Sequence, residues 1–421
     1  MSKALRGEIR VGGDKSISHR IVMLAALAQG KSQIKNLARG QDVQSTLELY
    51  QKLGLKVSAA NGTMLLTGGG LESLRTDSEM LYCGNSGTTL RLSLGILAGT
   101  NVECRLQGDE SLNRRPVKRV IVPLRLMGGN LAPIESDDRP PVMVRGCKLR
   151  GINVSTVVAS AQVKSAILLA GLHADGVTSV TEPEKSRDHT EIMLKHLGCN
   201  IDVEGKTAIL SPVKKIEAFE YAVPGDISTA MFFIVAALIT PGSELAVRGV
   251  LLNPTRTGAI AILRGMGAVI QEENVREQHG ELVGDLIVKS SQLNGFDGSD
   301  IVTATYIDEV PALAAAAMFA DGETSFHHIG ELRVKESDRA NGIADILKSY
   351  GGDCRLDDNT LRIRGGRGAR VGVAKHLGDH RLAMMMEIID LGLGGSINGN
   401  YGDTIAVSAP EFYDIMGKLT R

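Results

Sequence analysis

Six segments of the chain share one pattern, in which a small polar or acidic residue opens a run rich in Ala, Leu, Ile and Met. The pattern returns about every 70 residues, which is long enough for a supersecondary unit. Its openings are Asp14, Ser86, Ser160, Asp226, Asp308 and Asp379. The runs have almost no polar face, as at residues 307–319, and a helix of that kind is normally buried. The pattern therefore predicts six internal helices, one in each repeat.

A second pattern lies between these helices: an apolar residue, then a glycine, then a short run suited to a strand. This order is typical of a helix that ends at a glycine and leads into a strand. It occurs at residues 53–57, 127–131, 197–201, 266–270 and 350–354, and a sixth copy is not visible. Each repeat is thus predicted to alternate strands and two helices, with surface strands and an amphipathic helix packed around the internal one.

Six such repeats exceed one comfortable hydrophobic core, so the 421 residues are predicted to form two α/β domains of three repeats each. A solenoid is the alternative architecture for repeats, but its usual period of about 20–50 residues is shorter.

Composition and charge exclude several classes of protein. With 43% hydrophobic residues the chain is not disordered, and its longest apolar runs, residues 231–239 and 312–320, are too short to span a membrane. The net charge is −1 and only 3% of residues are aromatic, which argues against nucleic-acid or lipid binding. The five cysteines lie far apart with no metal-ligand spacing, and no secretory signal opens the chain. We therefore expect a cytoplasmic protein without a disulfide framework or a metal site.

The helix openings carry more polar chemistry than capping requires. Ser, Asp and Asn at a helix start contribute about 1 kcal/mol as caps, but Lys, Arg, Gln and His crowded within one turn are not needed for that. If the six N-termini converge, their amides and dipoles form an anion-binding site. Candidate anion contacts lie at residues 13–20, 84–91, 113–116, 332–339 and 379–381.

In this order and spacing the motifs resemble the 3-phosphoshikimate 1-carboxyvinyltransferase (5-enolpyruvylshikimate-3-phosphate, EPSP, synthase) family over residues 8–417, in the second of its two sequence classes. The resemblance rests on Gly13–Arg20, Gly84–Thr88, Arg115–Pro116, Ser160–Gln162, Pro224–Asp226, Arg333–Arg339 and Asp379–Arg381. It implies a two-domain inside-out α/β barrel, three repeats per domain, with internal helices whose N-termini face the interdomain cleft. The first domain would cover residues 13–225 and the second 226–421 plus 1–12, with chain crossings near Gly12-Gly13 and Pro224-Gly225.

The resemblance also implies the reaction: transfer of the carboxyvinyl group of phosphoenolpyruvate to the 5-hydroxyl of 3-phosphoshikimate, with release of phosphate, in the shikimate pathway to chorismate and the aromatic amino acids. No metal or cofactor is expected, the partners are these two small molecules, and the protein is expected to be a monomer. In this family the herbicide glyphosate occupies the phosphoenolpyruvate site.

The resemblance assigns the site residue by residue. Asp308 is expected to be the base and Glu336 the acid, with Lys15 nearby as the third catalytic residue. Contacts to 3-phosphoshikimate are expected from Lys15, Ser16, Arg20, Ser160, Gln162, Asp308 and Lys335. Contacts to phosphoenolpyruvate are expected from Lys15, Gly87, Arg115, Gln162, Arg339 and Arg381. Further candidates are Asn85, Arg187 and His380.

The chain departs from the family pattern at three places. Ala161 stands where the first class has a second serine, residues 406–410 lack the lysine of many relatives, and Gly13 replaces a common proline. Two rivals remain open. The sister transferase acting on UDP-N-acetylglucosamine typically has a cysteine before Arg-Pro, which residues 108–116 lack, and a silent phosphometabolite-binding protein would not need Lys15, Asp308 and Glu336.

Overall fold

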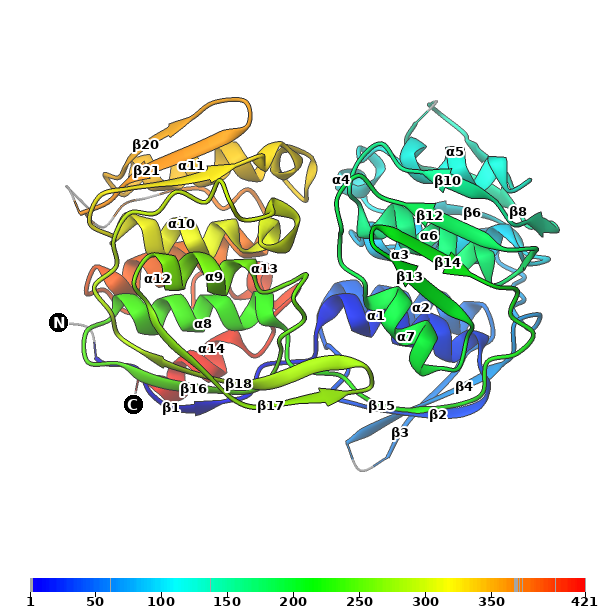
Figure 1. The fold of residues 1–421 in the computed structure, drawn as a ribbon, viewed down its shortest axis with the longest axis horizontal. Coiled ribbons are helices and arrows are strands. Elements are labelled where there is room, and N and C mark those ends of the chain that lie inside the picture. The colour runs from blue at the N-terminus through cyan, green and yellow to red at the C-terminus, as the bar shows by residue number, and fades with distance from the viewer. Residues whose placement is uncertain are drawn as a thin grey trace. The chain divides into compact units, whose positions relative to one another are not determined.

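The computed structural model describes residues 3–60, 62–136, 138–366, 370, 372, 374–397 and 399–420, and the chain forms two compact units (Figure 1). Unit 1 comprises Met1–Gly12, Pro224–Gln278 and Leu282–Arg421. Unit 2 comprises Gly13–Val223 together with His279–Glu281.

The six predicted internal helices are confirmed, three in each unit. Unit 2 holds α1 (Lys15–Leu27), α3 (Gly87–Ala98) and α6 (Ala161–Gly171), and unit 1 holds α8 (Ile227–Ile239), α10 (Val310–Met318) and α12 (His380–Gly392). Every residue of α8 and α10 is buried, as their lack of a polar face requires. The internal helices of each unit pack against one another and form the centre of its core.

Five of the six helices start with a side-chain cap at the predicted residue. Asp14, Ser86, Ser160, Asp226 and Asp379 each accept a hydrogen bond from a backbone N–H in the first turn. The fifth helix in chain order, α10, differs, because a 3₁₀ turn (η2, Ile307–Glu309) precedes it and no side chain caps it. The carboxylate of Asp308 is therefore left for other partners.

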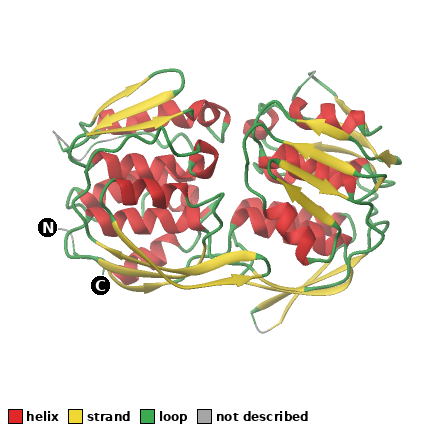
Figure 2. Ribbon diagram, in the orientation of Figure 1, coloured by secondary structure: helices red, strands yellow, loops and turns green. Residues whose placement is uncertain are grey.

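In each unit the internal helices are surrounded by open sheets and a second set of helices (Figure 2). In each four-stranded sheet an edge strand is parallel to its neighbour, and that neighbour is antiparallel to the third strand of the sheet. This edge strand comes first in the chain in three of the sheets, whereas in the sheet that contains residues 29–69 the edge strand Glu220–Ala222 comes last. One sheet of unit 2 has the strand order β15 (Glu220–Ala222), β2 (Gln29–Lys35), β4 (Thr63–Gly69), β3 (Lys56–Ala60), and a second has the order β5 (Met80–Tyr82), β6 (Glu103–Gln107), β8 (Val142–Arg145), β7 (Asn130–Pro133). A third sheet has the order β10 (Asn153–Ser155), β12 (Thr178–Thr181), β14 (Thr207–Leu210), β13 (Ile201–Glu204). A fourth is the short pair of β9 (Leu149–Arg150) and β11 (Ala174–Asp175). The remaining helices of unit 2 are α2 (Gln41–Lys52), α4 (Glu110–Asn113), α5 (Lys118–Leu126) and α7 (His189–His196).

Unit 1 has two sheets among its described residues, so its third repeat departs from the prediction. The sheets are β1 (Arg6–Ile9), β16 (Glu244–Leu251), β18 (Glu281–Lys289), β17 (Val269–Gln278); and β19 (Glu323–His327), β21 (Thr360–Arg364), β20 (Asp353–Leu356). Its other helices are α9 (Gly258–Gly265), η1 (Thr303–Thr305), η3 (Ile329–Val334), α11 (Arg339–Ser349), α13 (Gly402–Ala406) and α14 (Phe412–Leu419). The described part of the last repeat contains helices and connecting segments but no strand, which agrees with the missing sixth glycine pattern. Across the described chain no sheet closes on itself, so "barrel" describes strands placed around helices rather than a continuous wall.

The chain passes between the units at more places than the two crossings expected from the family resemblance. Besides the junctions after Gly12 and Val223, the tip of the β17–β18 hairpin, His279–Glu281, belongs to unit 2. There Glu281 Oε1 lies 2.7 Å from Nδ1 of His189, with both side chains fully buried. The His279 ring stacks on Tyr221 at a centroid distance of 4.3 Å. A hairpin that starts in one unit is thus anchored by its tip in the other.

Within the part of the chain that the structure describes, no helix is both long and apolar enough to cross a membrane.

Candidate functional site

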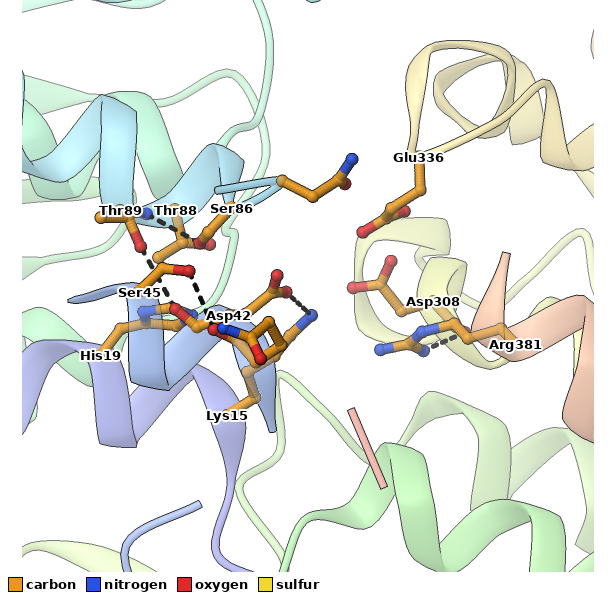
Figure 3. A network of polar contacts seen from close by, with 12 residues as sticks. Lys15, His19, Asp42, Ser45, Ser86, Thr88, Thr89, Asp308, Glu336 and Arg381 are labelled. Carbon is orange, nitrogen blue, oxygen red and sulfur yellow. Dashed lines mark hydrogen bonds and ion pairs between the residues drawn. The ribbon is translucent and has the colours of Figure 1, made fainter. Parts of the chain in front are cut away.

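The first group of predicted site residues lies in unit 2, at the start of α1. Lys15 is the first residue of this helix, and its Nζ lies 2.9 Å from Oδ2 of Asp42 in the first turn of α2 (Figure 3). The Lys15 side chain stays 20% exposed, so it can contact a ligand while Asp42 holds it. Asp42 was missed in the sequence, because an acid in the first turn of a helix is ordinarily explained by the helix dipole.

The starts of α3 and α6 are joined by a second group of predicted residues. Arg115 donates to the side-chain oxygen of Asn85 and, at 3.2 Å, to the hydroxyl of Ser111. Gln162 donates through Nε2 to the Thr88 hydroxyl at 2.9 Å. These bonds fix both an arginine and an amide at two helix N-termini, where anions are favoured.

Gly87 and Arg91 lie at the same place. Arg91 donates to Oε1 of Gln162 at 2.7 Å. In the sequence, the only indication of a role for Arg91 is its position at the end of the glycine-containing segment 84–91. A Cβ on Gly87 would lie 2.8 Å from Nη1 of Arg91 and 3.5 Å from Nη1 of Arg115. The glycine therefore keeps the space beside two guanidinium groups open.

Arg20 lies deeper than the resemblance suggests. Its guanidinium is buried and donates to the Thr190 hydroxyl at 2.7 Å, the Ser165 hydroxyl at 2.7 Å and the Ser16 carbonyl at 2.8 Å. Burial lowers the pKa of Arg20 to about 10. These bonds tie the first turn of α1, including half-buried Ser16, to α6 and α7. A direct contact of Arg20 with substrate stays a prediction.

Ser160 caps α6, and its backbone is bound by the side chain of Glu182. Its hydroxyl accepts from the Val163 N–H at 3.5 Å, and its own N–H donates to Oε1 of Glu182 at 3.1 Å. Arg187 is partly buried in the loop between β12 and α7, five residues beyond Glu182. Unit 2 thus carries nine of the predicted residues: Lys15, Ser16, Arg20, Asn85, Gly87, Arg115, Ser160, Gln162 and Arg187.

Another group of predicted site residues lies in unit 1 and is centred on Asp308. Its Oδ1 lies 3.1 Å from Nζ of Lys335 and 3.7 Å from Nη1 of Arg339. Arg381 donates to the backbone carbonyl of Asp308 (Figure 3). The Asp308 side chain keeps 14% of its surface exposed, so it is a carboxylate surrounded by cations and still accessible.

Arg339 is a cation of this group that contacts several carboxylates. It is buried, and donates to Oδ2 of Asp379 at 2.9 Å and to Oε2 of Glu336 at 2.5 Å. Burial alone would lower the pKa of Arg339, but Asp379 and Glu336 raise it above its ordinary value. Burial alone would likewise raise the pKa of Asp379, and Arg339 lowers it. Asp379 therefore stays ionised while it also caps α12.

Unit 1 also contains the predicted residue His380 and one of the departures from the family pattern. His380 is buried as the first residue of α12, beside Arg381. Residues 406–410, where relatives often have a lysine, follow α13 and supply no cation. Among the described residues, no group of three or more His, Cys, Asp or Glu side chains could hold a metal ion.

Gly13, one of the departures from the family pattern, has a structural explanation. A Cβ at this position would lie 1.9 Å from the carbonyl oxygen of Asn36. Only glycine fits this backbone approach.

Comparison with known proteins gives one consistent result. The family model described as EPSP synthase (3-phosphoshikimate 1-carboxyvinyltransferase) matches residues 1–416. A curated 3-phosphoshikimate 1-carboxyvinyltransferase of Syntrophomonas wolfei is 44% identical, over 99% of this chain and 98% of the relative. One of Geotalea daltonii is also 44% identical, over 100% of this chain and 98% of the relative.

A solved structure described as EPSP synthase from Acinetobacter baumannii is similar over the whole fold. Its TM-score is 0.87 at 39% identity, and the match covers 100% of this chain and 96% of that one. The resemblance seen in the motifs is confirmed at full length. The chain belongs to the EPSP synthase (3-phosphoshikimate 1-carboxyvinyltransferase) family.

Proposed function

We propose that this chain transfers the carboxyvinyl group of phosphoenolpyruvate to the 5-hydroxyl of 3-phosphoshikimate and releases phosphate, with its two units contributing different parts of the site. The observation that carries the proposal is the Asp308 carboxylate, which caps no helix and lies 3.1 Å from Lys335. A base placed among cations suits a reaction that removes a hydroxyl proton beside anionic substrates.

Unit 2 would bind most of 3-phosphoshikimate. Lys15, Ser16 and Ser160 lie at the starts of α1 and α6, where backbone amides and helix dipoles favour a phosphate. Gln162, fixed by Thr88 and Arg91, would contact both substrates. Arg20 would act through the Ser16 carbonyl as well as through its charge.

The phosphoenolpyruvate contacts would be shared between the units. Arg115 and the open space at Gly87 are in unit 2, and Arg339 and Arg381 are in unit 1. The two substrates bring about five negative charges, and positioned cations stabilise such charges best where water is excluded. Closure of the two units on the substrates would exclude water from the site. The two closing domains would comprise residues 13–225 and residues 226–421 plus 1–12.

The addition step would use Asp308 and Glu336. Asp308 would accept the proton of the 5-hydroxyl as its oxygen bonds to C2 of phosphoenolpyruvate, and Glu336 would donate a proton to C3. The contact of Glu336 with Arg339 favours the ionised form of Glu336. Donation from Glu336 therefore requires the Arg339 charge to be engaged by phosphoenolpyruvate instead. Glu336, now ionised, would then take a proton back from C3 as the C2–O bond to phosphate breaks, and the proton held by Asp308 would leave with the phosphate.

We further propose that the protein acts as a cytoplasmic monomer on small molecules and binds no nucleic acid. The free state of all five cysteines supports a reducing compartment. The small net charge, −1, supports the absence of nucleic-acid binding.

The proposed function is tested by phosphate release from phosphoenolpyruvate with 3-phosphoshikimate and with UDP-N-acetylglucosamine offered separately. Release only with 3-phosphoshikimate is the expected result. Release only with UDP-N-acetylglucosamine would assign the chain to the sister reaction. Binding of 3-phosphoshikimate without any release would make it a silent binding protein.

A further inference from the structure

Glu182 is a buried carboxylate directly behind the predicted 3-phosphoshikimate site. It follows β12, and its side chain is only 1% exposed. Its closest cation is Lys164 on α6, whose Nζ lies 2.6 Å from Oε2 of Glu182 and 2.8 Å from Oε1 of Glu191. Three buried charges thus lie under the first turns of α6.

The hydrogen-bond partners of the Glu182 carboxylate are donors, and they approach both of its oxygens. Oε1 accepts from the N–H of Ser160 at 3.1 Å and from the Ser186 hydroxyl at 2.5 Å. Oε2 accepts from Lys164 and, at 3.3 Å, from the N–H of Ser186. Each oxygen of this carboxylate therefore has two donors facing it.

The contact with Ser160 links this buried group to the site. Ser160 is the cap of α6, with φ −144° and ψ 106°, and its backbone N–H precedes the helix. That N–H is bound by Glu182, so the carboxylate sets the backbone orientation from which the Ser160 hydroxyl projects. Buried ion pairs are seldom required for stability, since apolar residues of similar volume often replace them without loss.

We propose that Glu182, held by Lys164, is a positioning residue that orients Ser160 for binding the phosphate of 3-phosphoshikimate. The inference rests on the proposed function, because it takes Ser160 as a contact of that substrate. Glu182 itself touches no substrate, and its effect is confined to the α6 cap. The neighbouring Gln162 is held separately by Thr88 and Arg91, so phosphoenolpyruvate binding is affected little.

Glu182→Gln disrupts this arrangement without changing the size of the side chain. An amide has one acceptor oxygen, so one side of the new glutamine side chain must present N–H groups to N–H donors. Glu191→Gln is the matched control, since it removes the same charge from the same lysine. Glu191 Oε1 contacts Lys164, and its Oε2 has no hydrogen-bond partner among the described residues, so an amide fits there.

The test measures binding of 3-phosphoshikimate alone by titration calorimetry, together with KM for each substrate, in wild type and both variants. Loss of one well-placed hydrogen bond predicts that Glu182→Gln raises Kd for 3-phosphoshikimate about tenfold. KM for phosphoenolpyruvate is expected to change less than about threefold, and Glu191→Gln to leave both constants within about twofold. Equal effects of the two variants, or no effect of Glu182→Gln, would overturn the inference. Wild-type protein that does not bind 3-phosphoshikimate would instead overturn the proposed function.

A second pair of variants covers the case in which Glu182→Gln does not fold. Both carry Lys164→Met and Glu191→Leu, and they differ only in Glu182→Gln or Glu182→Leu. Without the lysine, the amide oxygen of the glutamine can still accept from Ser160, and leucine cannot. Kd for 3-phosphoshikimate is expected to be about tenfold lower in the glutamine variant. Equal Kd values in this pair would also overturn the inference.

Discussion

At the scale of single residues, Asp308 differs from the residues that open the other internal helices because its carboxylate does not cap its helix and instead pairs with Lys335 and Arg339. Asp308→Asn keeps the shape but cannot accept a proton. We expect kcat to fall by about 10²–10⁴, the usual contribution of a general base, while Kd for 3-phosphoshikimate changes less than about threefold. Steady-state kinetics and calorimetry measure the two effects. An equal loss in kcat and affinity would make Asp308 a positioning residue only.

Gly87 tests the phosphoenolpyruvate half of the site. A methyl group there would lie against Arg91 and Arg115, within van der Waals reach of whatever binds them. Glyphosate is longer than phosphoenolpyruvate, so it has less room to adjust in a close-packed site. We expect Gly87→Ala to weaken glyphosate inhibition at least about tenfold more than it raises KM for phosphoenolpyruvate. Parallel changes in both constants would show that the inhibitor's extra atoms do not face Gly87.

His19 predicts a specific response to acid. It is fully buried, with Nδ1 2.6 Å from the Thr46 hydroxyl, and burial lowers its pKa to about 3. Between that value and the ordinary histidine pKa near 6.5, the unfolded chain binds a proton that the folded chain does not. Stability should therefore fall as pH drops below about 6.5, by about 1.4 kcal/mol per pH unit from this group.

The measurement compares urea unfolding of wild type and His19→Gln at pH 7 and pH 5. We expect wild type to lose about 2 kcal/mol more than the variant over this interval, because glutamine does not titrate. The same pH dependence in both proteins would show that His19 is not buried in its neutral form.

At the scale of elements, features set by neighbouring residues could be predicted from the sequence, whereas contacts between distant residues could not. The six helix starts could be predicted because a polar cap and an apolar run are adjacent in sequence. The contacts of Asp42 and Glu182 could not be predicted, because their partners Lys15 and Ser160 lie 27 and 22 residues away, respectively. In the sequence, only the missing sixth glycine pattern indicated that the described part of the last repeat has no strand. Arg20 was correctly placed near a helix start, but its burial depends on α6 and α7.

The β17–β18 hairpin gives a prediction at this scale. Gly280 at its tip has φ +82°, and a Cβ there would lie 2.9 Å from Cγ2 of Ile192. Gly198 has nearly the same φ, +80°, with nothing within 4 Å of an added Cβ. Both alanine variants cost about 1–2 kcal/mol of backbone strain, and Gly280→Ala should cost more because the tip is packed in unit 2. Thermal unfolding of the two variants measures the difference, and an equal loss of stability would mean that the tip contributes no packing.

At the scale of the whole molecule, the proposed reaction would be divided between two units of three repeats each. Unit 2 would contribute Lys15 and the starts of α1, α3 and α6, and unit 1 would contribute Asp308 with its surrounding cations. On this proposal both units would be needed, because neither unit alone holds both the proposed base and all the proposed anion contacts. The units could be predicted from the repeat count, whereas the anchored hairpin tip depends on contacts between distant parts of the sequence.

Transfer of a carboxyvinyl group by addition and elimination breaks the C–O bond of phosphoenolpyruvate, and this bond is the most direct point of test. Phosphoenolpyruvate labelled with ¹⁸O in the oxygen between C2 and phosphorus is incubated with the protein and 3-phosphoshikimate. We predict that the label leaves in inorganic phosphate and that the organic product carries an enol ether at the 5-oxygen of the shikimate ring. Label retained in pyruvate, or a phosphoryl group on the acceptor, would mean that the P–O bond is broken and would contradict the proposed reaction.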